Sequence, residues 1–406
     1  MTTTHEPLNF PFDDEYDRLN VPAQQAGLAD GDPLVRVHLP YGGDGWLARR
    51  YEDVKVVLAD PRFSRAVAFG KDIPRSTSFI TDQPGILDMD PPDHTRLRKL
   101  TAKAFTARRV ELLRPRTQEI IDGLLDGMVA AGPPTDLMSA FSWPLPITVI
   151  CELLGVPVED RVRFRVWTDK TLAITAFSPE DIFDARDRLR EYIAGLIEER
   201  RNEPRDDLLT ALVKARDEED RLSELEMVQF GVGLLVAGHE TTANQFGNFM
   251  YMLLTHPDEL AKLRADPALV DSAVEEMMRY TPLGGVNSGF PRIALEDLDL
   301  GGVTVRAGEA VFVDVASANR DPRVFDNPDR LDVARQVNPH IGFGHGAHHC
   351  LGAQLARLEL RMALTSVLHR FPDLAFAADE AEISWKQGRA VRGLEAMPVT
   401  WSEVRE

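Results

Sequence analysis

The sequence is poor in cysteine and has no long apolar run. Its 406 residues include two cysteines, Cys151 and Cys350. Two cysteines provide no disulfide framework and are typical of a reducing cytosol. The apolar segment 137–157 is interrupted by prolines, and no run of 18 apolar residues occurs, so a transmembrane helix is not expected. Because the start, MTTTHEPLNF, also lacks the features of a signal peptide, we expect a cytoplasmic protein that does not bind membranes.

The chain also has fewer basic than acidic residues. The chain has 46 Lys and Arg against 65 Asp and Glu, a formal net charge of −19. Such a charge disfavours nucleic acid and anionic membranes as partners. The hydrophobic content of 44% is enough for a substantial core. The length is compatible with one large domain or with two to three ordinary ones.

The second cysteine stands in an unusual stretch, FGHGAHHCLG, at Phe343 to Gly352. The residues after Cys350 place apolar side chains on one helical face, at Leu351, Leu355, Leu358 and Met362. A thiolate near a helix N-terminus is stabilised by the backbone N–H groups and the dipole. Gly344 and Gly346 allow a tight turn and the close approach of a flat partner. Such a thiolate suits the axial position of a haem iron, where it favours O–O cleavage.

Two other interpretations of this stretch remain open at this point. A lone cysteine is usually a small buried hydrophobe, so the stretch could be a structural loop. His345, His348 and His349 could instead form a zinc site with Cys350. The spacing is not a usual zinc pattern, and no second pair of ligands follows elsewhere in the sequence.

A second unusual stretch is VAGHETTANQFG, Val236 to Gly247, inside a long apolar helix predicted from Glu224 to Thr255. A glycine inside a helix costs roughly 1 kcal/mol relative to alanine. A buried glutamate, here Glu240, is rare unless it is paired. Residues that break local preferences in this way are typical of functional sites. The alternative is a core helix in which Thr241 bonds back to its own backbone.

Periodicity and turn residues predict the remaining elements. We expect a β-hairpin from Val35–His38 and Gly45–Ala48, a helix over Tyr51–Ala59, an irregular connection over 62–90, helices over 110–200 with a break at Ser178-Pro179, a helix over Asp271–Tyr280, and strands within 283–315 and 382–401.

FGHGAHHCLG matches the F-G-x-G-x-H-x-C-x-G signature of the cytochrome P450 family, and the chain resembles this family over nearly its whole length. The similarity is greatest to soluble bacterial class I members, notably actinomycete enzymes that tailor secondary metabolites. It implies a mainly α fold with a small β region, triangular in outline, in one domain over residues 1–406. Haem b would lie between the long central helix and the helix after the cysteine loop.

The resemblance also implies roles for individual residues. Cys350 would ligate the haem iron, and Glu240 and Thr241 in the A-G-x-E-T motif would deliver protons. Further haem contacts are expected from His94, Arg98, Arg292, His348, Phe343, Gly344, Ala237 and Gly238. A structural network is expected from Glu276 and Arg279 of the E-x-x-R motif with Arg330. Substrate contacts are expected from Leu87, Gly233, Val236, Ala237, Val286, Asn287 and Val391.

The function implied is a monooxygenase that uses O₂ and two external electrons to hydroxylate or epoxidise an apolar small molecule of polyketide or macrolide type. Because no flavin or iron–sulfur motif occurs, the electrons would come from a ferredoxin and its NAD(P)H-dependent reductase. A basic face for that partner is expected from Lys99, Lys103, Arg108, Arg109, Arg357 and Arg361. A catabolic hydroxylase of terpenes, fatty acids or xenobiotics and a non-catalytic haem sensor are the alternatives. A monomer is expected.

Overall fold

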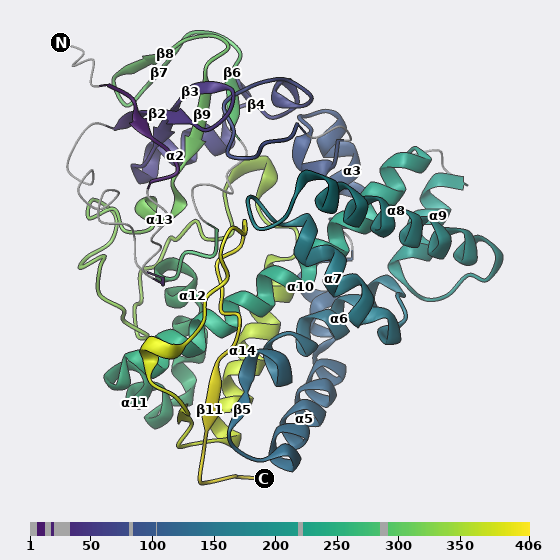
Figure 1. Cartoon of the computed structure of the whole chain (residues 1–406), viewed down its shortest axis with the longest axis vertical. Coiled ribbons are helices and arrows are strands. Elements are labelled where there is room, and N and C mark those ends of the chain that lie inside the picture. The colour runs from purple at the N-terminus through teal and green to yellow at the C-terminus, as the bar shows by residue number, and fades with distance from the viewer. Residues whose placement is uncertain are drawn as a thin grey trace. The chain divides into compact units, whose positions relative to one another are not determined.

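The computed structural model describes residues 6–12, 18–19, 33–80, 84–102, 104–217, 222–284 and 291–406. The chain divides into two compact units. Unit 1 consists of residues 1–95, 275–331 and 336–350, and unit 2 of residues 96–274, 332–335 and 351–406. Figure 1 shows strands from the first part of the chain, in purple, beside strands from residues 292–313, in green, and helices dominating the rest. This agrees with the predicted class, mainly α with a small β region.

Unit 1 is built on a six-stranded mixed sheet. The strand order is β1 (Leu8–Asn9), β2 (Leu34–Leu39), β3 (Gly43–Ala48), β9 (Ala310–Val313), β6 (Arg292–Ala294) and β4 (Phe63–Ser64). β2 and β3 form the predicted antiparallel hairpin, and β3 pairs with β9 in parallel. A separate two-stranded sheet contains β7 (Leu298–Leu300) and β8 (Val303–Val305).

Helix α2 (Tyr51–Ala59) packs its apolar face on this sheet. Its buried residues Tyr51, Val54 and Val57 belong to a core cluster that also contains strand residues such as Phe63 and Val311. The helix ends where predicted, at Ala59, because Pro61 cannot continue it. α13 (Val315–Ala318) lies against α2.

Unit 2 is mainly helical. Its helices are α4 (Ala107–Glu111), α5 (Arg114–Ala131), α6 (Pro144–Leu154), α7 (Arg161–Thr171), α8 (Pro179–Asn202), α9 (Leu208–Asp217), α10 (Glu224–Thr255), α11 (Pro257–Ala265) and α14 (Ala353–Arg370). Strands β10 (Ala375–Phe376), β11 (Pro398–Thr400) and β5 (Thr135–Asp136) form a small sheet. Helices α3 (Asp93–Ala102) and α12 (Val270–Tyr280) each span a boundary between the units.

The longest helix, α10, has the predicted bounds, Glu224 to Thr255. A capping box starts it: the Ser223 side chain accepts from the N–H of Glu226, and the Glu226 carboxylate accepts from the N–H of Ser223. Most residues from Val236 onward are buried, since other helices, α6 and α14 among them, cover it. α10 is therefore a central element of unit 2.

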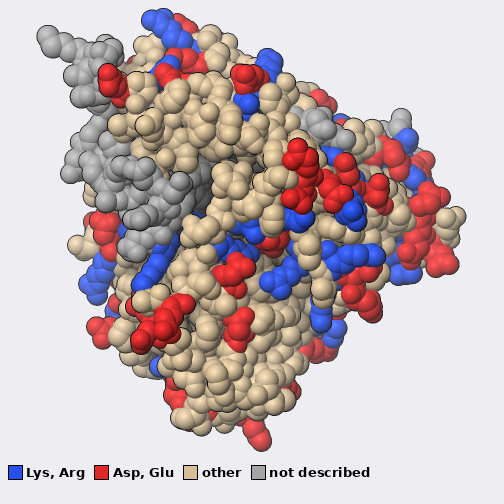
Figure 2. Space-filling model, in the orientation of Figure 1, with Lys and Arg blue, Asp and Glu red and all other residues tan. Residues whose placement is uncertain are grey.

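The break at Ser178-Pro179 is confirmed, with Ser178 as the N-cap of α8. None of the helices in the described residues is long and apolar enough to cross a membrane. Acidic side chains are frequent over α8 and are mixed with basic ones (Figure 2). Several form pairs within one helix, such as Arg188 with Asp184 at 2.7 Å. These pairs offset only part of the negative charge.

Candidate functional site

The cysteine loop of unit 1 folds back on itself. The backbone N–H of Cys350 donates to the carbonyl of Phe343 at 2.9 Å, and that of His349 donates to Gly346 at 3.1 Å. Cys350 is exposed and makes no disulfide. The helix predicted to follow, α14, begins at Ala353 with Gly352 as its N-cap. The loop therefore presents an exposed cysteine that forms no disulfide on a closed, hydrogen-bonded turn.

Two glycines make this turn possible. Gly344 and Gly346 have φ values of +75° and +71°, a region that side chains with a Cβ rarely adopt. A Cβ on Gly346 would also lie 2.5 Å from the carbonyl oxygen of Leu58 at the end of α2. Gly346 is thus required by both conformation and packing, and Gly344 by conformation alone.

A buried ion pair on α12 is connected to the chain that leads to the loop. Arg279 and Glu276, one helical turn apart on α12, form two N–O contacts of 2.8 Å, and neither side chain is exposed. Arg279 also donates to the carbonyls of Asn319 (2.9 Å), Pro328 (2.7 Å) and Arg330 (3.2 Å). This bidentate geometry is the strong form of an ion pair.

The network reaches the chain that leads to Cys350. Asn338 donates to the Glu276 carboxylate at 3.2 Å, and the Asn319 side chain accepts from the N–H of Ile341 at 2.8 Å. Arg330, predicted as the third member, contributes its backbone carbonyl, while its side chain is exposed. The guanidinium of Arg279 can only donate hydrogen bonds, which explains why it contacts the backbone carbonyl of Arg330 rather than the cationic side chain.

Basic side chains converge elsewhere in unit 1. The rings of His94 on α3 and His348 in the cysteine loop lie 4.2 Å apart between centroids, and His94 is buried. Burial, and then repulsion from His94, Arg292 and Arg65, lower the pKa of His348 to about 3. Arg65, just after β4, was not expected from the sequence. The only hint was a charged residue between Phe63 and the apolar run at 66–69.

This cluster fits the carboxylates of a haem. Burial lowers the pKa of Arg292 and brings that of Arg65 to about 10. The neighbouring Asp90 carboxylate already accepts hydrogen bonds from the Ser64 hydroxyl and the Arg65 backbone N–H. An anionic group would relieve the repulsion among the cations. An exposed cysteine and a separate basic cluster match a cofactor that carries both a metal and carboxylates.

In unit 2, one stripe of α10 stays uncovered. Gly233 and Ala237 are exposed and Thr241 is half-buried, while Leu235, Val236, His239 and Glu240 are buried. The three less buried residues are spaced by four, so they share one face of the helix. The helix is buried on most sides, and its less buried face consists of small residues and one hydroxyl group.

The Thr241 hydroxyl donates to the carbonyl of Ala237 at 2.7 Å, the local bond expected for a threonine inside a helix. Its lone pairs remain available to accept a hydrogen bond. Gly238 has a separate structural reason: a Cβ there would lie 2.6 Å from the side chain of Ile150 on α6. Close packing of α10 on α6 explains this glycine, and its place in an oxygen groove stays a prediction.

The other predicted residues are distributed as follows. Leu87 is exposed in unit 1, and Val391 is half-buried in unit 2. Arg98 lies one turn after His94 on α3. Val286, Asn287 and Lys103 lie outside the described residues.

The expected basic face falls on elements of unit 2. Lys99 on α3 and Arg108 and Arg109 on α4 are exposed. Arg357 and Arg361 are half-buried on α14, which contacts α4. Arg361 pairs with Asp271 at 3.0 Å, so part of its charge is offset.

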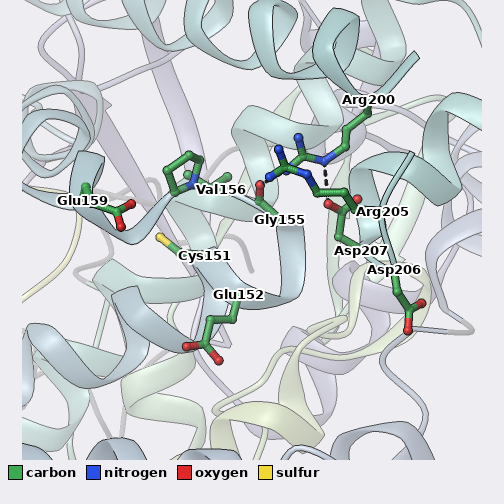
Figure 3. A pocket seen from close by; sticks show the side chains of 10 residues that line it. Cys151, Glu152, Gly155, Val156, Glu159, Arg200, Arg205, Asp206 and Asp207 are labelled. Atoms are coloured by element: carbon green, nitrogen blue, oxygen red, sulfur yellow. Dashed lines mark hydrogen bonds and ion pairs between the residues drawn. The ribbon is translucent and has the colours of Figure 1, made fainter. Parts of the chain in front are cut away.

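The second cysteine belongs to a different place. Cys151 lines a pocket of about 400 Å³ in unit 2 beside Gly155 and the Arg200–Asp207 ion pair (Figure 3). Burial raises the pKa of the Cys151 thiol to about 12, so it is protonated and a poor ligand. Among the described residues no group of three His, Cys, Asp or Glu side chains could hold a metal ion. A zinc site at His345, His348 and His349 therefore gains no support.

Taken together, the mainly helical fold, the cysteine turn and the basic cluster suit a haem protein, and the comparisons agree. The family model described as cytochrome P450 matches residues 178–379. The chain is 52% identical to nocardicin C N-oxygenase of Nocardia uniformis subsp. tsuyamanensis, over 99% of this chain and 100% of that protein. It is 47% identical to mycinamicin IV hydroxylase/epoxidase of Micromonospora griseorubida, over 98% and 100% respectively.

A solved structure is equally similar. The LnmA cytochrome P450 hydroxylase of the leinamycin biosynthetic pathway of Streptomyces atroolivaceus is 51% identical, with a TM-score of 0.90 over 97% of this chain and 100% of that one. The chain belongs to the cytochrome P450 family. The resemblance to actinomycete members and the P450 fold are confirmed, and the chain is a haem-dependent monooxygenase.

Proposed function

We propose that this monooxygenase carries haem b on Cys350 and hydroxylates or epoxidises an apolar secondary metabolite. The observation that supports the ligand assignment most strongly is the closed, glycine-dependent turn that leaves Cys350 exposed. The similarity to enzymes named for nocardicin C and mycinamicin IV supports the substrate class.

The residues of unit 1 would hold the cofactor. The Cys350 side chain would hold the haem iron, and His94, Arg292, His348 and Arg65 would bind the haem carboxylates. When bound, the haem supplies the one-electron and O₂ chemistry. The Glu276–Arg279 network keeps the cysteine turn in one conformation, so the ligand is positioned before the cofactor arrives.

The residues of unit 2 would transfer protons. On the uncovered face of α10, Gly233 and Ala237 leave space, and the Thr241 hydroxyl can accept a hydrogen bond while it donates to Ala237. The buried Glu240 carboxylate next to it can hold or release a proton. Positioned proton transfer of this kind contributes about 10²–10⁴-fold to a rate.

The ligand assignment is tested by the spectrum of the reduced carbon-monoxide complex. The purified chain should show the thiolate-type Soret band, Cys350→Ser should lose it, and Cys151→Ala should keep it. A thiolate-type band in the folded Cys350→Ser variant would refute the assignment.

The substrate class is tested by a spectral-shift screen of the holoenzyme. We expect macrolides and other secondary metabolites to shift the Soret band and to bind more tightly than terpenes or fatty acids. Tighter binding of camphor or laurate would instead favour a catabolic hydroxylase.

We further propose that a ferredoxin with its NAD(P)H-dependent reductase supplies electrons at the basic face. Reversing the exposed charges in Arg108→Glu/Arg109→Glu should slow the first electron transfer at low ionic strength, because steering between opposite charges raises association rates. Arg188→Glu on α8 is the control and should have no effect. An unchanged rate in the double variant would contradict this docking site. The single domain, the monomer and the cytoplasmic location remain predictions.

A further inference from the structure

A lysine far from α10 in the sequence lies beside its buried glutamate. The Nζ atom of Lys386, from the segment after β10, is 3.6 Å from Oε2 of Glu240 and 3.8 Å from Oδ1 of Asp169 on α7. It also lies 3.9 Å from the centre of the Trp143 ring. The Lys386 side chain is 8% exposed. An ammonium group is thus enclosed by two carboxylates and an indole face, all within unit 2.

The two oxygens of Glu240 differ in their surroundings. Oε2 accepts from the Asn244 amide at 3.1 Å and faces Lys386. Oε1 is buried and has no hydrogen-bond partner among the described residues. It lies 3.8 Å from Nε2 of His239. Contacts of Oε2 therefore hold the carboxylate in place, while Oε1 can take up a proton or accept a hydrogen bond.

His239 adds no positive charge beside Oε1. Burial lowers its pKa, and its Nδ1 bonds the carbonyl of Leu235 at 2.7 Å, so Nδ1 carries the proton of the neutral ring. Nε2 lies 3.1 Å from the Thr168 hydroxyl, which donates its proton to the Arg165 carbonyl at 3.0 Å. Lys386 is consequently the cation nearest to Glu240 among the contacts of these side chains.

Asp169 links this lysine to α7, and the neighbouring backbone links it to the segment after α7. Arg389 binds both oxygens of Asp169, at 2.8 and 3.1 Å. The N–H groups of Ile174, Thr175 and Ala176 all point at the carbonyl of Gly388, at 2.9 to 3.3 Å. The segment that carries Lys386 is thereby attached to α7 and to the chain that follows it.

We propose that Lys386 is a positioning residue for Glu240, and that Asp169 shares its charge and so adjusts how readily Glu240 takes up a proton. This rests on the proposed function only where it concerns proton delivery. The groups that face the pair are Glu240 and His239 from α10, Arg165 and Asp169 from α7, and Arg389 and Glu395 from the C-terminal segment.

The proposal makes two predictions of opposite sign. Removing the ammonium in Lys386→Met raises the pKa of Glu240, since an opposite charge at this distance favours the carboxylate. Asp169→Asn lowers the same pKa, because it removes a negative charge and leaves Glu240 as the only carboxylate of the two that Lys386 pairs with.

The first readout does not depend on turnover. Infrared difference spectra of the holoenzyme against its Glu240→Gln variant isolate the Glu240 carboxyl band, which is then followed with pH. Lys386→Arg should stay within about 0.5 pH unit of the parent, since it keeps the charge. Lys262→Met is the matched control, because Lys262 pairs at 2.7 Å with another buried carboxylate, Glu259 on α11. It should leave the Glu240 titration unchanged.

The second readout is NADPH oxidation by the same variants with spinach ferredoxin and ferredoxin reductase, without added substrate. Its pH profile should move up in Lys386→Met and down in Asp169→Asn. An unmoved infrared titration in either variant, or shifts of the same sign in both, overturns the proposal. Opposite infrared shifts with an unmoved pH profile uphold the positioning role and refute proton delivery by Glu240, which belongs to the proposed function.

Discussion

The buried pair of Glu276 and Arg279 provides a sharp test of how the cysteine turn is held. In Arg279→Met the side-chain volume is largely kept, but two 2.8 Å contacts to Glu276 and three bonds to backbone carbonyls are lost. The Glu276 charge would then remain in a site where its side chain has no exposure. We expect a large loss of stability.

The magnitude follows from the burial. Removing one partner of a buried ion pair costs about 3–5 kcal/mol, because the remaining charge is uncompensated. Domains are stable by only about 5–15 kcal/mol, so the variant should unfold at a much lower urea concentration. Arg188→Met on α8 breaks an ion pair of similar length, 2.7 Å, between side chains that are more than half exposed. That change should cost at most about 0.5 kcal/mol.

The assay is urea unfolding of the holoenzyme, followed by far-ultraviolet circular dichroism and by the thiolate-type Soret band of the reduced carbon-monoxide complex. The double variant Glu276→Leu/Arg279→Met should be more stable than Arg279→Met alone, since it removes the orphaned charge. The Soret band should be lost at lower urea than the helical signal, because the pair holds the cysteine turn directly.

Two results would refute this reasoning. A loss in Arg279→Met no larger than that in Arg188→Met would show that the network does not stabilise the fold. Additive losses in the double variant would show that Glu276 and Arg279 are not energetically coupled.

Three further predictions concern other residues. Burial raises the pKa of Glu359 on α14 from about 4.5 to about 8. Its contribution to stability is therefore full below pH 4.5 and falls by about 1.4 kcal/mol per pH unit up to pH 8. Urea unfolding at pH 5 and pH 8 should show that Glu359→Gln lacks this loss of stability, and an equal loss in the parent and the variant would refute the argument. Gly346→Ala should lower thermal stability more than Gly344→Ala, because a Cβ at Gly346 would lie 2.5 Å from the Leu58 carbonyl oxygen, whereas one at Gly344 would make an ordinary contact of 3.9 Å with the His348 carbonyl oxygen. Equal losses would contradict the packing argument. Thr241→Ala should release more H₂O₂ per NADPH than Thr241→Ser once a substrate is known, and equal ratios would exclude a role for the hydroxyl.

Local sequence signals predicted the elements that depend on neighbouring residues. The helix from Glu224 to Thr255 was predicted with its observed bounds, because a serine cap and a continuous apolar pattern are both local features. The helix over Tyr51–Ala59 and the first hairpin were predicted for the same reason. The F-G-x-G-x-H-x-C-x-G pattern identified the family, since its glycines and cysteine are adjacent in the chain.

Contacts between distant residues could not be predicted in this way. Arg65 belongs with His94, Arg292 and His348 only because a sheet and a loop bring four separate segments together. No periodicity in the sequence reports such a meeting. The role of Gly238 was likewise assigned from its motif, whereas its missing side chain is explained by Ile150, 88 positions earlier in the numbering.

The sequence by itself determined the family, the thiolate ligand expected at Cys350 and the helix that carries Glu240 and Thr241. Only the tertiary structure decided what surrounds Glu240. Lys386 and Asp169 are far from it along the chain, and they meet because the C-terminal segment packs against α7 and α10. The strength of a buried charge depends on which opposite charges are folded against it, and that is a property of packing rather than of any single stretch of sequence.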